Sequence, residues 1–150
     1  MDNRHEVICA WCKVVTGYSD VKNSHGICSS CMNVILQLPN LSYDELNNLP
    51  FGIVSLTQDG TITFYNESEE KLSDRKADEV INRNFFTDIA PCTKVKEFYG
   101  QFQEFLLSPK FTKDFSFTFY FPNKKVMVEI VFVKHTQNEV IVAIKKDEGQ

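Results

Sequence analysis

Apolar and polar residues alternate along several stretches of the chain after residue 50. In "FSFTFYF", residues 115–121, every second position is a phenylalanine, so four phenylalanines share one face of a predicted strand. The runs "KKVMVEIVFV", residues 124–133, and "EVIVAIKK", residues 139–146, predict two more strands. An earlier pair, "FGIVSLT" and "TITFY", is joined by Gln58-Asp59-Gly60, which predicts a β-hairpin. The pattern therefore predicts five strands.

The segment between the second and third of these strands has a helical pattern. After Tyr65 the chain is polar and helical in character to about Asn82. In residues 94–108, apolar residues recur at steps of three and four, which predicts a longer amphipathic helix: Val95, Phe98, Phe102, and Phe105 or Leu106. The order of elements predicts an α+β domain, with helices on one face of a five-stranded antiparallel sheet. A ligand is expected between the sheet and the helices.

The first 40 residues have a different character. Residues 29–38 predict a short helix that ends at Pro39. Ser42 stands three residues before Glu45, a capping-box signature for another short helix. The loop-like residues between the two helices place a domain boundary near residue 40, so we expect a small element over 1–40 and the main domain over 41–150.

Composition and charge narrow the class of protein. The 150 residues are 43% hydrophobic and 24% charged, with a net charge of -4. Neither half carries the basic patch that nucleic-acid binding needs. The sequence has no apolar run long enough for a membrane span, and no signal peptide follows Met1. We therefore expect a cytoplasmic protein whose thiols stay reduced.

Four of the five cysteines form a C-x2-C-x15-C-x2-C pattern: Cys9, Cys12, Cys28 and Cys31. Two-residue spacing lets both thiolates of a pair face one tetrahedral ion, which predicts a closed structural zinc site. Two redox-active pairs, or four unrelated buried cysteines, are the alternatives. His25 is either a ligand, a donor to a thiolate or an ordinary loop residue.

The fifth cysteine, Cys92, lies in a stretch that is similar to a known family. The order of elements, with "DG" in the first hairpin and "YN" after its second strand, resembles the PAS sensor fold. "LPFGIVSLTQDGTITFYNESEEKLSDR" and "NFFTDIAPCTKVKEFYGQF" resemble the photoactive yellow protein family, which is built on that fold. The similarity runs from about Leu49 to Lys146 and needs no gap between Phe51 and Phe121.

This resemblance implies a chromophore, p-coumaric acid, held as a thioester on Cys92. It implies that Tyr65 and Glu69 hydrogen-bond the phenolic oxygen, that Ser73 supports Tyr65, and that Arg75 shields the pocket. It also implies that the pocket is lined by Phe85, Phe86 and Phe119. The implied function is a blue-light photoreceptor that signals by chromophore isomerisation and proton transfer from Glu69.

Each of these residues also has a structural interpretation. A lone cysteine is usually a small buried hydrophobic residue, and Glu69 could be the capping partner of Asn66. The alternative function is a PAS module that binds another ligand or a protein without photochemistry. No nucleophile–base pair or open metal site points to an enzyme. The expected partner is a separate downstream signalling protein, and a homodimer stays open.

Overall fold

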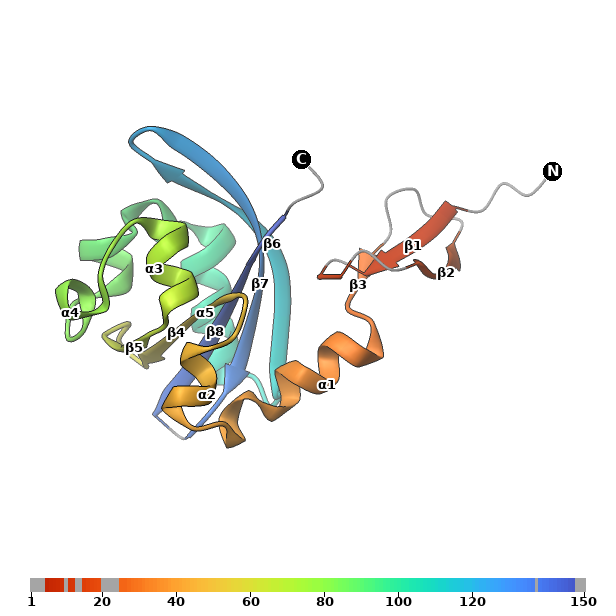
Figure 1. Ribbon diagram of the computed structural model, residues 1–150, viewed down its shortest axis with the longest axis horizontal. Coiled ribbons are helices and arrows are strands. Elements are labelled where there is room, and N and C mark those ends of the chain that lie inside the picture. Colours follow the sequence, from red (N-terminus) through yellow and green to blue (C-terminus); the bar gives the residue numbers. More distant parts are fainter. Residues whose placement is uncertain (1–4, 10, 13–14, 20–24, 137, 148–150) are drawn as a thin grey trace. The chain divides into compact units, whose positions relative to one another are not determined.

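The computed structural model describes residues 5–9, 11–12, 15–19, 25–136 and 138–147. The chain divides into two compact units, Met1–Gln37 and Leu38–Gln150. The elements of both are labelled in Figure 1.

The first unit is a small sheet followed by a helix. Its strands are β1 (His5–Cys9), β2 (Val15–Ser19) and β3 (His25–Gly26). β1 lies between the other two, antiparallel to β2 and parallel to β3. The helix α1 (Ser29–Gln37) follows and confirms the helix predicted over 29–38.

The second unit is built on a five-stranded antiparallel sheet, as the alternation predicted. Its strand order is β5-β4-β8-β7-β6. The strands are β4 (Gly52–Thr57), β5 (Ile62–Tyr65), β6 (Thr112–Phe121), β7 (Lys124–Lys134) and β8 (Glu139–Lys146). Two hairpins thus flank a central helical segment in sequence, while β8 lies between β4 and β7 in space.

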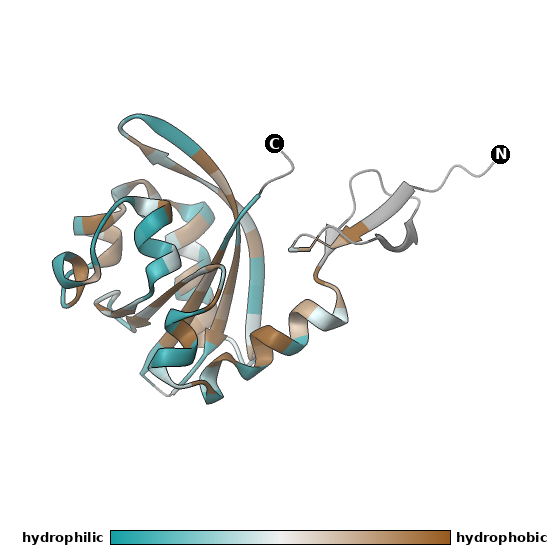
Figure 2. Cartoon of the chain, viewed as in Figure 1, coloured by the Kyte–Doolittle hydropathy of each residue, from teal (hydrophilic) through white to brown (hydrophobic). Residues whose placement is uncertain are grey.

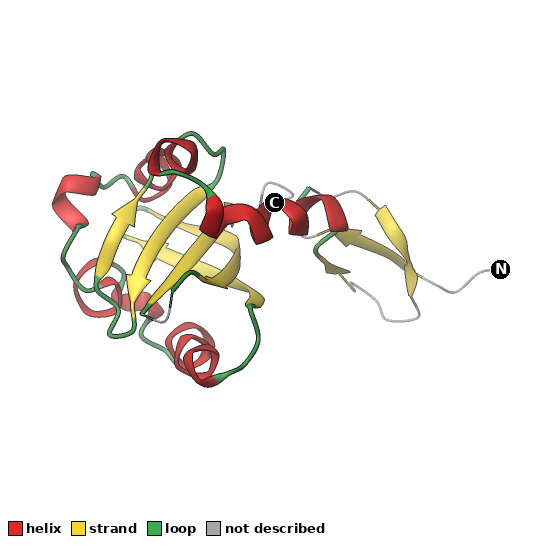
Figure 3. Ribbon diagram, turned by 90° about the horizontal axis from the view of Figure 1, so that it is seen from below, coloured by secondary structure: helices red, strands yellow, loops and turns green. Residues whose placement is uncertain are grey.

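Short helical elements precede the sheet and connect its two hairpins. They are η1 (Leu38–Asn40), α2 (Tyr43–Asn47), α3 (Glu67–Ser73), α4 (Ala77–Val80), η2 (Phe85–Ile89), η3 (Pro91–Thr93), η4 (Lys96–Gly100) and α5 (Gln101–Leu107). In Figure 1, α3 and α4 lie on the same side of the sheet, and Figure 3 shows helices around the strands of this unit. The predicted capping box is present, because Ser42 Oγ accepts from the Glu45 amide and Glu45 Oε1 accepts from the Ser42 amide.

The helix predicted over 94–108 differs from a single α-helix. It begins at Lys96 with one π turn, closed by the Gly100 amide bonding to the Val95 carbonyl, and continues as α5. The extra residue in a π turn shifts the helical register. Phe98 and Phe102 both face the core, as predicted, whereas Val95 is 43% exposed.

The core lies between the sheet and these helices and is dominated by aromatic rings. Phe98 is in its centre, with ring centroids 5.1 to 6.2 Å from six other phenylalanines: Phe85, Phe86, Phe115, Phe117, Phe119 and Phe132. The predicted phenylalanine face of β6 is confirmed, since all four of its rings contact this core. Figure 2 shows hydrophobic residues along the middle of the sheet and hydrophilic residues along α3.

The opposite face of the central strands is buried as well. Ile53 of β4, Val131 and Val133 of β7, and Ile141 of β8 are all fully buried. By strand alternation they point away from the aromatic core. η1 lies against β7, and its Leu38 is also fully buried.

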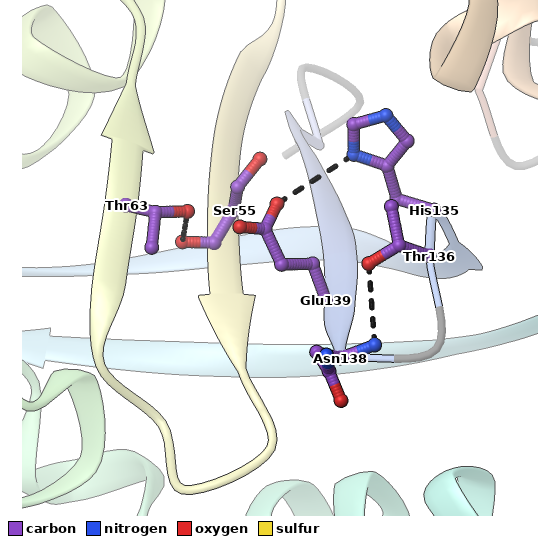
Figure 4. A network of polar contacts seen from close by, with 6 residues as sticks. All are labelled: Ser55, Thr63, His135, Thr136, Asn138 and Glu139. Carbon is purple, nitrogen blue, oxygen red and sulfur yellow. Dashed lines mark hydrogen bonds and ion pairs between the residues drawn. The ribbon is translucent and has the colours of Figure 1, made fainter.

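Two turns lie at one end of the sheet, one shaped by a glycine and the other by polar contacts. Gly60 in the β4–β5 turn has φ +91°, and a Cβ there would lie 2.7 Å from the Phe86 ring, so both conformation and space favour glycine. In the β7–β8 turn, His135 Nδ1 lies 3.7 Å from Glu139 Oε2, and the Asn138 amide donates to Thr136 Oγ1 (Figure 4).

Candidate functional site

The four cysteines of the first unit converge on one point. Cys9 ends β1, Cys12 lies in the turn after it, Cys28 follows β3 and Cys31 is in the first turn of α1. Their four Sγ atoms all lie within 4.8 Å of one another. Four thiols at this separation suit a tetrahedral cation with sulfur ligands.

Backbone amides prepare Cys9 for the charged form. The Sγ atom of Cys9 accepts hydrogen bonds from the amides of Trp11, Cys12 and Cys28 at 3.3 to 3.4 Å. Burial would raise the pKa of the Cys9 thiol, but these bonds outweigh burial and lower it to about 6. Burial, together with hydrogen bonds to the neighbouring sulfurs, raises the pKa of Cys31.

Cys9 thus accepts a negative charge easily, whereas Cys31 resists one unless a cation is present. This donor set fits zinc. The His25 side chain lies outside the described part of the chain, so its role at the cluster stays a prediction.

In the second unit, α3 brings three of the predicted residues together. Tyr65, the last residue of β5, donates from its hydroxyl to Ser73 Oγ at 2.6 Å. Ser73 in turn donates to the backbone carbonyl of Glu69 at 2.8 Å, one helical turn earlier. Ser73 therefore links the Tyr65 hydroxyl to the helix that carries Glu69.

Glu69 is a buried acid without a hydrogen bond to one of its oxygens. Its side chain is 3% exposed, and within the described residues Oε1 has no hydrogen-bond partner. Burial raises the pKa of Glu69 to about 8, and the nearby Tyr65 hydroxyl offsets only part of that effect. At pH 7 the carboxyl group is therefore mostly neutral and can donate a proton or a hydrogen bond.

The hydrogen bonds argue against a capping role for the Glu69 carboxyl. Asn66 caps α3, since its Oδ1 accepts from the Glu69 amide at 3.0 Å. A capping box would need the Glu69 carboxylate to accept from the Asn66 amide. That amide instead donates to the Ile53 carbonyl at 3.0 Å. The Glu69 side chain is thus free to serve another purpose.

Gly52 gives the Glu69 carboxyl the space it occupies. A Cβ built on Gly52 would lie 2.2 Å from Glu69 Oε1, far inside contact distance. The sequence-based prediction missed this residue, although an isolated glycine at the start of a strand can mark such a close approach. Gly52 and Glu69 therefore form one packed unit between β4 and α3.

Tyr65 responds to the same surroundings. Burial disfavours its phenolate and is the main cause of its raised pKa, and the Glu69 charge adds to this. Ser73 and Arg75 act in the opposite direction on the pKa of Tyr65. Arg75 itself is exposed, and it lines a depression of about 590 Å³ together with Ser73 and Phe121.

Cys92 lies in η3, a three-residue turn between the two π turns η2 and η4. It is partly buried and packs against the aromatic core. It also lines a surface depression of about 460 Å³ with Val95, Phe117 and Tyr120. The thiol can therefore be approached from solvent while its other side faces the core.

The three phenylalanines expected to line a pocket belong to the same core as Tyr65 and Cys92. Phe85, Phe86 and Phe119 are each at most 3% exposed. The depression beside Cys92 includes neither Tyr65 nor Glu69. The structure thus joins Tyr65, Glu69 and Ser73 directly, and connects Cys92 to them through the aromatic core.

Comparisons with known proteins agree with this geometry. A family model described as PAS fold matches residues 44–145. Photoactive yellow protein from Halochromatium salexigens is 38% identical over 93 residues, which cover 62% of this chain and 74% of that protein. Photoactive yellow protein from Cereibacter sphaeroides is 40% identical over 82 residues, which cover 55% of this chain and 66% of that protein.

A solved structure is also similar. The photoactive yellow protein domain of the sensor histidine kinase Ppr from Rhodospirillum centenum superposes with a TM-score of 0.68 at 32% identity. The match covers 73% of this chain and 97% of that domain. In the described part of the chain, no helix combines the length and apolarity that crossing a membrane requires.

Proposed function

Because the chain belongs to the photoactive yellow protein family, which has the PAS fold, we propose that it is a blue-light receptor carrying p-coumaric acid as a thioester on Cys92. The sensor role follows from the family. The attachment at Cys92 and the roles of individual residues rest on the family resemblance and on the fit of the site.

One observation carries the proposal: a neutral, buried Glu69 whose Oε1 has no partner among the described residues. An unpaired polar atom in a core costs free energy unless a ligand or another group satisfies it. A phenolic oxygen beside Glu69 and Tyr65 would remove that cost. The orphaned oxygen fits a ligand that ends in a phenolic group, and Gly52 leaves room for the Glu69 carboxyl that would contact it.

The residues of the site would contact different parts of this ligand. Cys92 would tether the acyl end, and Phe85, Phe86 and Phe119 would exclude water around the ring. Tyr65 and Glu69 would donate to the phenolic oxygen, which favours its charged form. Tyr65 and Ser73 each have one hydroxyl proton, so Ser73 would then donate to Tyr65 and give up its bond to the Glu69 carbonyl. Arg75 would shield the site from solvent.

When bound, the chromophore supplies absorption of blue light and a double bond that light isomerises. Glu69 holds the proton that matters for signalling, on its carboxyl oxygen. Loss of that proton would leave a buried carboxylate, which is costly and favours local opening of α3. The first unit, by its four cysteines, would hold a structural zinc ion. We propose a zinc element over residues 1–40 and a PAS domain over 41–150, although the compact units divide three residues earlier, after Gln37.

Signalling by this domain would be non-enzymatic. A sensor domain without enzymatic activity passes a conformational change to a separate protein, so we propose a downstream signalling partner in the cytoplasm. The net charge of -4 argues against nucleic acid as that partner.

Reconstitution with an activated ester of p-coumaric acid tests the proposal. The unloaded protein should gain a visible absorption band that bleaches under blue light and recovers in the dark. Cys92→Ala should gain no such band, because it lacks the nucleophile for the thioester. A protein that folds normally, yet shows no band, would instead be a PAS module for another ligand.

A further inference from the structure

A third depression lies between α3 and the sheet, at the end where β7 begins and β8 ends. Its volume is about 430 Å³. Three lysines line it, one from each of three elements: Lys71 of α3, Lys124 of β7 and Lys146 of β8. No part of the proposed photochemistry uses these lysines.

Strand alternation aims two of the lysines at the helices. Val126 and Ile144 point into the core. Lys124 stands two positions before Val126 on β7, and Lys146 stands two positions after Ile144 on β8. Residues two apart on a strand share a face, so both lysines continue the core face where an apolar residue is the ordinary choice. Lys71 comes from α3, which covers that face.

The charge of this depression is uniform. Of the residues that line it in the described part of the chain, none is acidic, although the protein as a whole has a net charge of -4. The neighbouring depression shares Lys71 and Lys124 but also includes Asp74 and Glu79. Three positive charges around one hollow favour an anion there.

The floor of the hollow is apolar. It includes Leu72, Val126 and Ile144, and its volume is in the range of small-molecule sites. We propose that this hollow binds a small amphiphilic anion, with a carboxylate or phosphate held by Lys71, Lys124 and Lys146 and an apolar body on the floor. The proposal does not depend on the chromophore.

Titration of the full-length, unloaded protein tests it, by calorimetry and by amide chemical shifts. The probes are octanoate, octyl phosphate, octanamide and inorganic phosphate. Saturable binding of octanoate or octyl phosphate is expected, with the tighter of the two identifying the headgroup. Octanamide and inorganic phosphate should each bind about tenfold more weakly, because one lacks the charge and the other the apolar body.

Neighbouring lysines on the same strands offer matched controls. Lys124→Gln and Lys146→Gln should each weaken binding about tenfold, as expected for the loss of a charged contact. Lys125→Gln and Lys145→Gln change the net charge equally but lie on the other face, so they should leave affinity within about twofold. Folding of each variant is checked by its amide spectrum.

The proposal is overturned if neither amphiphile binds saturably at millimolar concentration. It is also overturned if octanamide binds as tightly as octanoate, or if the control variants weaken binding as much as the lysines of the hollow. These outcomes leave the photoreceptor proposal untouched, because no chromophore is present in the experiment.

Discussion

At the scale of single residues, the close contact between Glu69 and Gly52 governs the chemistry of the site. The carboxyl group is buried against a backbone that has no side chain there, and Oε1 has no partner among the described residues. Its neutrality at pH 7 follows from this setting and not from its place in the sequence. Two predictions test the pair.

The first concerns Glu69 and the stability of the unloaded protein. The pKa of Glu69 is about 8 in the folded protein and near 4.5 for an unhindered glutamate. The folded state therefore binds more protons between these values, so the free energy of unfolding should fall as pH rises from about 5 to 8. In Glu69→Gln the free energy of unfolding should fall less over this pH range, by a few kcal/mol, as measured by urea unfolding at several pH values.

A wild-type protein whose stability changes with pH no more than that of Glu69→Gln would contradict this prediction. Glu104→Gln is the control, because Glu104 is exposed on α5 and should leave the pH dependence unchanged.

The second prediction concerns Gly52→Ala. The new Cβ must displace the Glu69 carboxyl, which sits at the end of a flexible side chain, so the fold should survive. The chromophore would then lose one charge-assisted donor, and the pH midpoint of its visible band should rise by about one unit. Gly100→Ala is the control, since a Cβ built on Gly100 would come no closer than 3.5 Å to its nearest neighbour, the Lys96 side chain. Equal midpoints in all three proteins would show that Gly52 does not position Glu69.

At the scale of elements, the four-cysteine cluster and the small sheet around it depend on each other. A unit of fewer than about 40 residues rarely buries enough apolar surface to fold without a metal or disulfide. Cys9 and Cys12 flank Trp11, which is the protein's sole tryptophan and is 4% exposed. Trp11 is therefore a built-in probe of this unit.

Removal of zinc should unfold the first unit and spare the second. We expect about one zinc ion per chain by elemental analysis, lost in Cys28→Ser. A chelator should shift Trp11 fluorescence to longer wavelength, as the indole becomes exposed, while the second unit keeps its melting transition. Cys92→Ser should behave like wild type. Zinc-free protein with unchanged fluorescence would rule out a structural metal.

At the scale of the whole molecule, hydrogen bonds connect the start of α3, the helix that carries Glu69, to the segment that precedes the sheet. Asn66 Nδ2 donates to the carbonyls of Leu46 and Phe51, and Ser68 Oγ donates to the Leu49 carbonyl at 2.5 Å. Both side chains are at the N-terminal end of α3. Opening of α3 would therefore release the chain between α2 and β4.

Hydrogen exchange in dark and light tests this route. Illumination of the reconstituted protein should speed exchange of residues 42–53 by about tenfold or more, since their tethers to α3 are weakened. The faster exchange should extend to residues 1–41, which directly precede this segment in the chain. Strand β8 should exchange equally in both states. Identical protection of residues 1–48 in dark and light would exclude a signal through this end.

Much of the fold could be predicted because its determinants are local. Alternation located the five strands, and the Ser42–Glu45 pair marked the start of α2. The π turns could not be predicted, because no short-range pattern distinguishes their i→i−5 hydrogen bonds from the i→i−4 bonds of an α-helix. Burial of the second sheet face was also missed, because it depends on residues such as Leu38 that folding brings against the sheet.

The candidate site divides in the same way. Cysteine spacing and the residues around Cys92 were enough to predict a metal cluster and a tether, and the four Sγ atoms do converge. Only the tertiary structure decided three features of the site and its surroundings. They are the neutral carboxyl of Glu69, its contact with Gly52, and the hollow lined by Lys71, Lys124 and Lys146. Spacing and periodicity are properties of neighbours along the chain, whereas a pKa and a hollow depend on groups that folding brings together.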